Sequence, residues 1–150
     1  MANTYTCLHC HVVFSTKNRE GWIAPNIEQR VWAYLGGIAR ENGMTALRIG
    51  GVDDHVHLVV GMPPTIAPSK AVQLLKGASS RWIHETFSAL VGFAWQDGYG
   101  AFSVSKSQLP DVIRYVEAQR RHHRTWTFQE EYRTFLDKQG TEYDERYLWG

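Results

Sequence analysis

Residues 44–62 constrain the fold more than any other part of the chain, because two strand patterns follow each other there with no room for a helix. Residues 44–52 and 54–62 are rich in residues that favour strands, and a tight turn near Gly51–Asp54 joins them. A connection this short joins antiparallel strands, since a parallel pair needs a long crossover. The sequence therefore predicts an antiparallel hairpin in this part of the chain.

Helical and extended patterns surround this hairpin. Apolar residues spaced three and four apart mark helices on both sides of it. A capping-box spacing of Thr127 and Glu130 begins a further helix that ends near Gly140. The order predicts an α+β fold: a ferredoxin-like antiparallel sheet with packed helices, and a helix bearing Tyr115 near the C-terminus. We expect one domain over residues 1–150, with strands at 5–15, 44–52, 54–62 and within 93–105, and helices at 25–42, 69–87 and 109–123.

The composition limits the function without identifying it. The 150 residues include 16 Lys and Arg against 15 Asp and Glu, so the net charge is +1 and a nucleic-acid partner must be argued from local patches. No apolar stretch approaches the ~18 residues of a membrane span, and the first residues do not resemble a signal peptide. Two cysteines provide no disulfide framework, so we expect a cytoplasmic protein without membrane contacts.

Two histidines stand one residue apart inside the second strand of the hairpin. Side chains alternate along a strand, so His55 and His57 project from one face, with their Cα atoms roughly 7 Å apart. We expect this strand to be half buried, with Val56 and Leu58 in the core and the histidines on its outer face. Two imidazoles at this spacing can bind one metal ion, but a pair of solvated or hydrogen-bonded histidines fits the motif equally well.

Two other sites that contain histidine are less well supported. A histidine-triad nucleotide hydrolase needs a third histidine two residues after His57, where this chain has Val59. Zinc ligands could come from Cys7, Cys10 and the neighbouring histidines, but residues three apart on a strand face opposite ways. Core packing is therefore the better interpretation of Cys10.

The helix expected at 109–123 carries an unusual polar stripe. Tyr115 and Gln119 are four residues apart and His122 continues the same line, so the three share one face. Taken alone, this stripe is typical of a solvated face with an amphipathic tyrosine. Arginines around the stripe, such as Arg120 and Arg121, suit a phosphate backbone, although a solvated helix end would carry them as well.

The order of several segments, over nearly the whole chain, resembles the small HUH transposases with a single catalytic tyrosine. Proteins of this type move insertion sequences as single-stranded DNA. The histidine pair alone is a weak signal, whereas the ordered set is specific. The set comprises FSTKNRE (14–20), DHVHLVV (54–60), LLKGASSRW (74–82), YGAFSVS (99–105), YVEAQRRHH (115–123) and EYDERYLWG (142–150).

The resemblance implies a metal-dependent transposase and endonuclease that cuts and rejoins single-stranded DNA. It implies that His55 and His57 bind a divalent ion, Mg²⁺ or Mn²⁺, with Gln119 as a third ligand. It also implies that Tyr115 is the nucleophile and forms a 5′-phosphotyrosine with the DNA. The implied partners are single-stranded DNA with hairpins at the element ends and a second copy of the chain. In such a homodimer, the tyrosine helix of one subunit can complete the histidine pair of the other.

Basic side chains are candidates for contacts with DNA phosphates, although each could also be an ordinary surface charge. They are Lys17, Arg19, Lys76, Arg81, Arg120 and Arg121. Two alternative functions stay open: a domesticated endonuclease specific for repeat hairpins, and a non-catalytic module that binds hairpin DNA. The joint presence of Tyr115, Gln119 and both histidines argues against the non-catalytic module.

Overall fold

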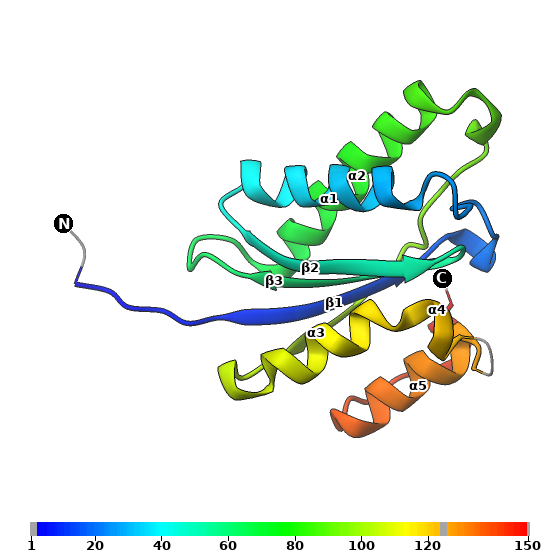
Figure 1. The fold of residues 1–150 in the computed structure, drawn as a ribbon. Coiled ribbons are helices and arrows are strands. Elements are labelled where there is room, and N and C mark those ends of the chain that lie inside the picture. The colour runs from blue at the N-terminus through cyan, green and yellow to red at the C-terminus, as the bar shows by residue number, and fades with distance from the viewer. Residues whose placement is uncertain (1–2, 124–125, 150) are drawn as a thin grey trace.

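A four-stranded antiparallel sheet forms the centre of the molecule and lies between two layers of helices (Figure 1). The computed structural model describes residues 3–123 and 126–149. The spatial order of the strands, β2-β3-β1-β4, and their antiparallel pairing confirm the predicted ferredoxin-like sheet. The strands are β1 (His9–Ser15), β2 (Thr45–Val52), β3 (His55–Gly61) and β4 (Gly100–Ser103).

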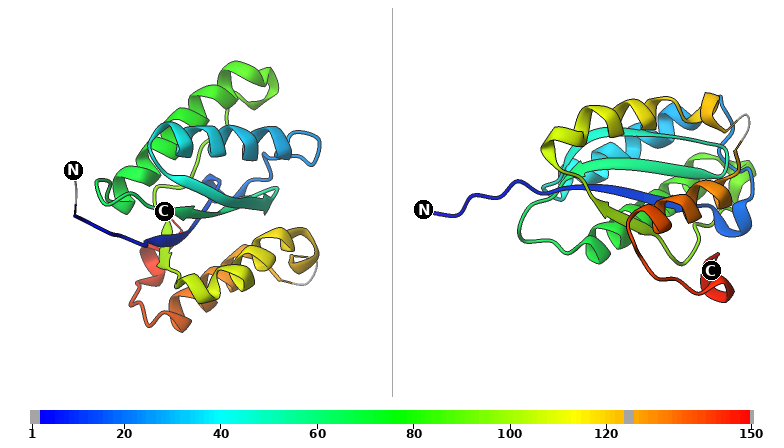
Figure 2. Two further views of the ribbon diagram at one scale, coloured as in Figure 1. Left: turned by 60° about the vertical axis from the view of Figure 1, so that its left-hand side comes forward. Right: turned by 90° about the horizontal axis from the view of Figure 1, so that it is seen from below.

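The helices divide into two groups that cover opposite faces of this sheet. Helices α1 (Glu28–Glu41) and α2 (Pro68–Thr86) lie on one face (Figure 1). The other face carries α3 (Leu109–Glu117), α4 (Gln119–His122) and α5 (Phe128–Lys138), which Figure 2 shows from below. None of the helices in the described ranges is both long and apolar enough to cross a membrane.

The helix expected at 109–123 is divided into α3 and α4. The break falls at Ala118, whose φ of −95° and ψ of 15° depart from helical values. Thr127 is confirmed as the N-cap of α5, since the backbone N–H of Glu130 donates to Thr127 Oγ1 over 3.2 Å and α5 begins at the next residue. The Glu130 carboxylate accepts from the Thr127 hydroxyl over 3.1 Å, in place of the backbone N–H of a full capping box. The other predicted elements lie within a few residues of their observed bounds.

Each face of the sheet has its own apolar cluster. The larger one fills the space under α1 and α2 and includes Phe14, Leu58 and Cys10, which confirms the core position expected for Cys10. The smaller one lies under α5 on the opposite face. It consists of Val13, Phe102, Phe128, Tyr132 and Leu136.

The expectation that β3 is half buried is wrong. All residues from His55 to Val60 are buried, and both histidines have an exposed fraction of 0%. Val56 and Leu58 do pack in the larger core, but the face that carries the histidines is covered as well. Helices α3, α4 and α5 provide that cover, and the strand alternation alone could not reveal it.

A glycine in β2 lets α3 pack closely against the sheet. Gly50 lies opposite His57 in the pairing of β2 with β3, so the two residues share a face. A Cβ atom at Gly50 would lie 2.7 Å from the backbone oxygen of Val116 in α3. Because Gly50 has no side chain, the α3 backbone reaches the strand, and Tyr115 comes close to the histidines.

We predict that Gly50→Ala destabilises the protein by about 1–3 kcal/mol, because the added methyl group overpacks a backbone contact. Urea denaturation measures the change. The matched control is Gly77→Ala in α2, where a Cβ meets nothing within 4 Å. That substitution should raise stability by up to about 1 kcal/mol through helix propensity. Equal midpoints for Gly50→Ala and the unaltered protein would show that α3 does not press on β2.

Candidate active site

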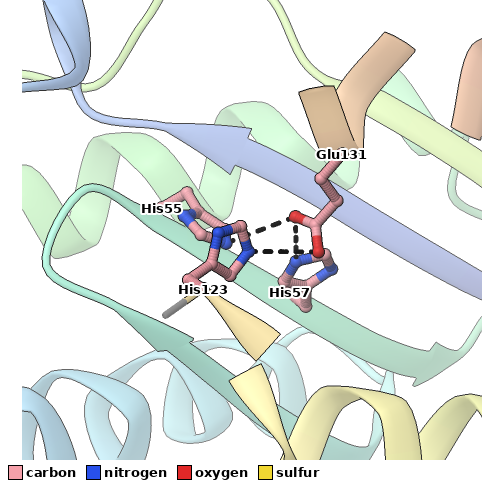
Figure 3. Close-up of side chains that lie close together, drawn as sticks. All are labelled: His55, His57, His123 and Glu131. Carbon is pink, nitrogen blue, oxygen red and sulfur yellow. Dashed lines mark hydrogen bonds and ion pairs between the residues drawn. The ribbon is translucent and has the colours of Figure 1, made fainter. Parts of the chain in front are cut away.

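In both histidines of β3, the Nδ1 atom contacts a polar side chain. Nδ1 of His55 lies 2.7 Å from Oδ1 of Asp54, and Nδ1 of His57 lies 2.8 Å from Nε2 of His11. These contacts fix the orientation of both rings. The Nε2 atoms of the pair consequently face the same region, where a carboxylate lies (Figure 3).

That carboxylate belongs to Glu131 of α5, a residue that the sequence analysis did not select. Its Oε1 lies 2.9 Å from Nε2 of His57 and 3.4 Å from Nε2 of His55. Its Oε2 lies 3.2 Å from Nε2 of His123, which follows α4 (Figure 3). Glu131 has an exposed fraction of 0%, so helix α5 places a full carboxylate inside the molecule.

The charges of this cluster compensate one another. Burial raises the pKa of Glu131, but the nearby histidines outweigh it and hold that pKa far below its usual range. Burial also disfavours protonation of His55, yet hydrogen bonds to Asp54 and Glu131 raise its pKa to about 9. Burial dominates at His57 and His11. It lowers the pKa of the His57 imidazole, and it lowers that of the His11 imidazole to about 3.

Tyr115 of α3 reaches the same carboxylate from the other side. Its hydroxyl donates to Oε2 of Glu131 and lies 3.2 Å from Nε2 of His122. Its ring is 5.7 Å from the ring of His57, centroid to centroid. Burial and the charge of Glu131 raise the pKa of the Tyr115 hydroxyl, so in this arrangement it is a neutral hydrogen-bond donor.

Gln119 lies at the start of α4 and is buried. Its Oε1 is 3.0 Å from Nε2 of His55, and its Nε2 donates to the backbone oxygen of Tyr115 over 3.3 Å. The polar stripe of Tyr115, Gln119 and His122 therefore faces the histidine pair and is not a solvated face.

Two of the six basic candidates line a cavity beside this cluster. Arg19 and Arg120 border a cavity of about 830 Å³, together with His123 and Trp126. The Arg120 guanidinium contacts Glu28 over 2.6 Å, and Arg19 has a backbone φ of 55°. Lys17 is exposed in the short turn that also contains Arg19, and Arg121 is exposed on α4.

The other two basic candidates lie on α2, across the sheet from the histidines (Figure 1). Arg81 is exposed. The ammonium of Lys76 donates to the backbone oxygens of Gln96 and Gly98 over 2.6 and 2.7 Å, and burial lowers its pKa to about 8. Lys76 thus holds the loop before β4, and its contact with DNA stays a prediction.

The donor set around Glu131 fits a divalent cation. One ligand atom each from His55, His57, His123 and Glu131 lies within 4.8 Å of the others. Octahedral ligands at about 2.1 Å from an ion are about 3 Å apart, which agrees with the 2.9 and 3.4 Å between Nε2 and Oε1 atoms. Imidazole nitrogens and carboxylate oxygens are suitable ligands for Mn²⁺ and, with more oxygen, for Mg²⁺.

Comparisons with known proteins show the family of the chain. A model of the family described as "Transposase IS200 like" matches residues 4–119. The chain belongs to this family of HUH transposases with a single tyrosine. The transposase is 27% identical over 117 residues to ISDra2 transposase TnpA of Deinococcus radiodurans. The aligned region covers 75% of this chain and 84% of that protein.

Solved structures share the fold of this transposase. A crystal structure described as a transposase from Deinococcus radiodurans R1 matches with a TM-score of 0.67 and 27% identity, over 79% of this chain and 95% of that chain. The structure of a REP-associated tyrosine transposase bound to a REP hairpin matches with a TM-score of 0.59, over 85% of this chain and 74% of that chain. At 12% identity, the second likeness shows the fold alone.

We predict that His11→Phe weakens Mn²⁺ binding by roughly 10- to 100-fold, because His57 loses the partner that fixes its ring. Phe102 and Phe135 lie beside His11, so a phenyl ring suits the site. Mn²⁺ titration followed by electron paramagnetic resonance measures the affinity. His9→Phe is the control on the same strand face. Unchanged affinity in a folded His11→Phe protein would show that His11 does not support the metal site.

Proposed function

We propose that this transposase cuts and rejoins single-stranded DNA through a covalent bond between Tyr115 and a DNA 5′-phosphate. One observation carries the proposal: the Tyr115 hydroxyl and the Nε2 atoms of His55 and His57 all converge on the two oxygens of one carboxylate. A nucleophile and a pair of metal-type ligands therefore meet at a single point. A phosphate held beside Glu131 would be within reach of both.

The reaction follows from this arrangement. The Tyr115 oxygen attacks phosphorus, the bond from phosphorus to the 3′ oxygen breaks, and that oxygen takes up a proton from water to leave as a 3′-hydroxyl. The phenol proton has Oε2 of Glu131 as its nearest acceptor. The phosphotyrosine conserves the energy of the phosphodiester bond, so a 3′-hydroxyl of another strand can attack it and rejoin DNA without ATP.

Three residues of the chain would hold the divalent ion in this proposal. Nε2 of His55, Nε2 of His57 and Oε1 of Gln119 are the candidate ligand atoms, and Mg²⁺ or Mn²⁺ is the expected ion. When bound, the ion neutralises charge on the phosphate and aligns the bond that breaks. Asp54 and His11 keep the two imidazoles turned toward it.

The cavity beside the site suits an unpaired DNA strand. Its wall carries both charges, Arg19 and Arg120 beside Asp53 and Asp54, with Arg120 paired to Glu28. Trp126 supplies an aromatic surface on which a base can stack. The solved relative with this fold that is bound to a REP hairpin supports hairpin DNA as the partner. We therefore expect the hairpin to position the strand and the cavity to receive its unpaired part.

We predict that Tyr115→Phe folds and binds a hairpin oligonucleotide but forms no covalent adduct with it, because only the nucleophilic oxygen is removed. The assay incubates protein with a single-stranded oligonucleotide and Mn²⁺, separates the products under denaturing conditions and maps the adduct by mass spectrometry. The matched control is Tyr143→Phe, which alters an exposed tyrosine and should leave adduct formation unchanged.

Two results would contradict this mechanism. An adduct on Tyr99 or Tyr132 would assign the nucleophile elsewhere. Equal cutting of the same sequence as a perfect duplex would exclude a mechanism that acts on single strands.

The proposal includes a homodimer with composite active sites, which the sequence resemblance implies. In the structure of one chain, Tyr115 lies beside His57 of the same chain. Exchange of the segment from α3 onward between two subunits would rebuild these contacts across the dimer, as in domain swapping. The residues at each site would then be the same, but they would come from two chains.

Mixing two inactive variants tests this exchange. Tyr115→Phe keeps both histidines, and His55→Ala keeps the tyrosine. A mixed dimer with composite sites contains one site with both defects and one with neither, so we expect part of the adduct formation to return. Verified heterodimers that stay inactive would place each site within one subunit.

A further inference from the structure

The position of Glu131 is set by the packing of α5 and not by solvation. Phe128, Tyr132 and Leu136 of this helix join the smaller apolar cluster against the sheet. Glu131 lies between Phe128 and Tyr132 in the chain and is carried into the same interface. A buried carboxylate is costly unless it is paired, so its partners must account for its presence.

All ion-pair partners of Glu131 within the described residues are imidazoles. They are His55, His57, His122 and His123, at 2.9–3.7 Å. Lysine or arginine, the ordinary partners of a structural buried carboxylate, do not pair with it in this part of the chain. Two of them, His55 and His57, turn Nε2 toward the same oxygen, Oε1. Imidazole nitrogens and carboxylate oxygens are both common ligands of divalent metals.

The two oxygens of Glu131 face different groups. Oε1 lies close to Nε2 of both His55 and His57, whereas Oε2 receives the Tyr115 hydroxyl and lies near His123. An ion between Oε1 and the two imidazoles would take the place of the protons that these atoms now share. The other oxygen would still face the nucleophile.

The family match does not reach this residue. It ends at residue 119, and α5 begins at Phe128. The ligand set that the resemblance implies consists of two imidazoles and an amide, all neutral when they bind metal. A carboxylate adds a negative charge and a hard oxygen, which Mg²⁺ and Mn²⁺ prefer.

We propose that Glu131 is an anionic ligand of the divalent metal, binding through Oε1 beside His55 and His57. The inference deepens the proposed function and rests on its metal site. Helix α5 is then part of the metal centre, and the ligand lies next to the nucleophile Tyr115. The metal of this chain is held by a charged set of ligands and not by a neutral one.

Mn²⁺ affinity of the full chain without DNA tests the proposal, by calorimetry or electron paramagnetic resonance. Glu131→Gln keeps the shape of the side chain and removes its charge, and it should weaken Mn²⁺ binding at least 10-fold. Glu130→Gln changes the exposed neighbour in the same helix turn and should bind Mn²⁺ as the unaltered protein does. Glu131→Asp retains a carboxylate with a shorter reach and should lie between them.

The opposite outcome has a clear meaning. If Glu131 only closes the site, removing its charge leaves Mn²⁺ affinity unchanged or increases it, and the proposal is overturned. Should Glu131→Gln fail to fold, Glu131→Asp decides on the same measurement, and Mn²⁺ affinity equal to that of the unaltered chain overturns the proposal. Adduct formation at Tyr115 is measured separately. The proposed function can therefore stand when this inference fails, and this inference can stand when the proposed function fails.

Discussion

The register between β1 and β3 is the constraint on which the rest of the site depends. His11 lies opposite Val59, which makes it the diagonal neighbour of His57 on the same face. The two imidazoles therefore meet at 2.8 Å, and Nε2 of His57 is left to face Glu131. A slip of one residue would turn His57 into the larger core and replace it with Val56 or Leu58. The apolar alternation that builds the core thus also fixes the chemistry on the other face.

The two faces of the sheet divide the tasks of stability and function. The larger cluster under α1 and α2 holds most of the buried apolar side chains, including Phe14 and Leu58. The face under α3–α5 contains a small apolar cluster beside a network of buried polar groups. Such a network is costly unless every member is paired. Val13 and Phe128 exclude water beside it, and Asp54 and His11 satisfy the outer nitrogens of the histidine pair.

The sequence predicted the order of the elements, the shared face of the histidines and the stripe of Tyr115 and Gln119, because these follow from periods of two and 3.6 residues. Burial of that face depends on helices that begin about 50 or more residues further along the chain, so β3 was wrongly expected to be half buried. Glu131 was missed because acidic residues are common in the first turn of a helix, where they are usually solvated and complement the helix dipole. The signal was present: Phe128, Tyr132 and Leu136 form an apolar helical stripe, and Glu131 lies at the same side of it.

An acidic ligand would change the balance of charge at this site. Without metal, Glu131 is balanced by His55, whose pKa its neighbours raise to about 9. A divalent ion would bring positive charge to the same point, so the carboxylate would keep a partner if His55 lost its proton to bind metal. With neutral ligands alone, the phosphate of the DNA would be the first anion to reach a buried ion. With Glu131 as a ligand, an anion is already in place, and the site can hold its metal before the DNA arrives.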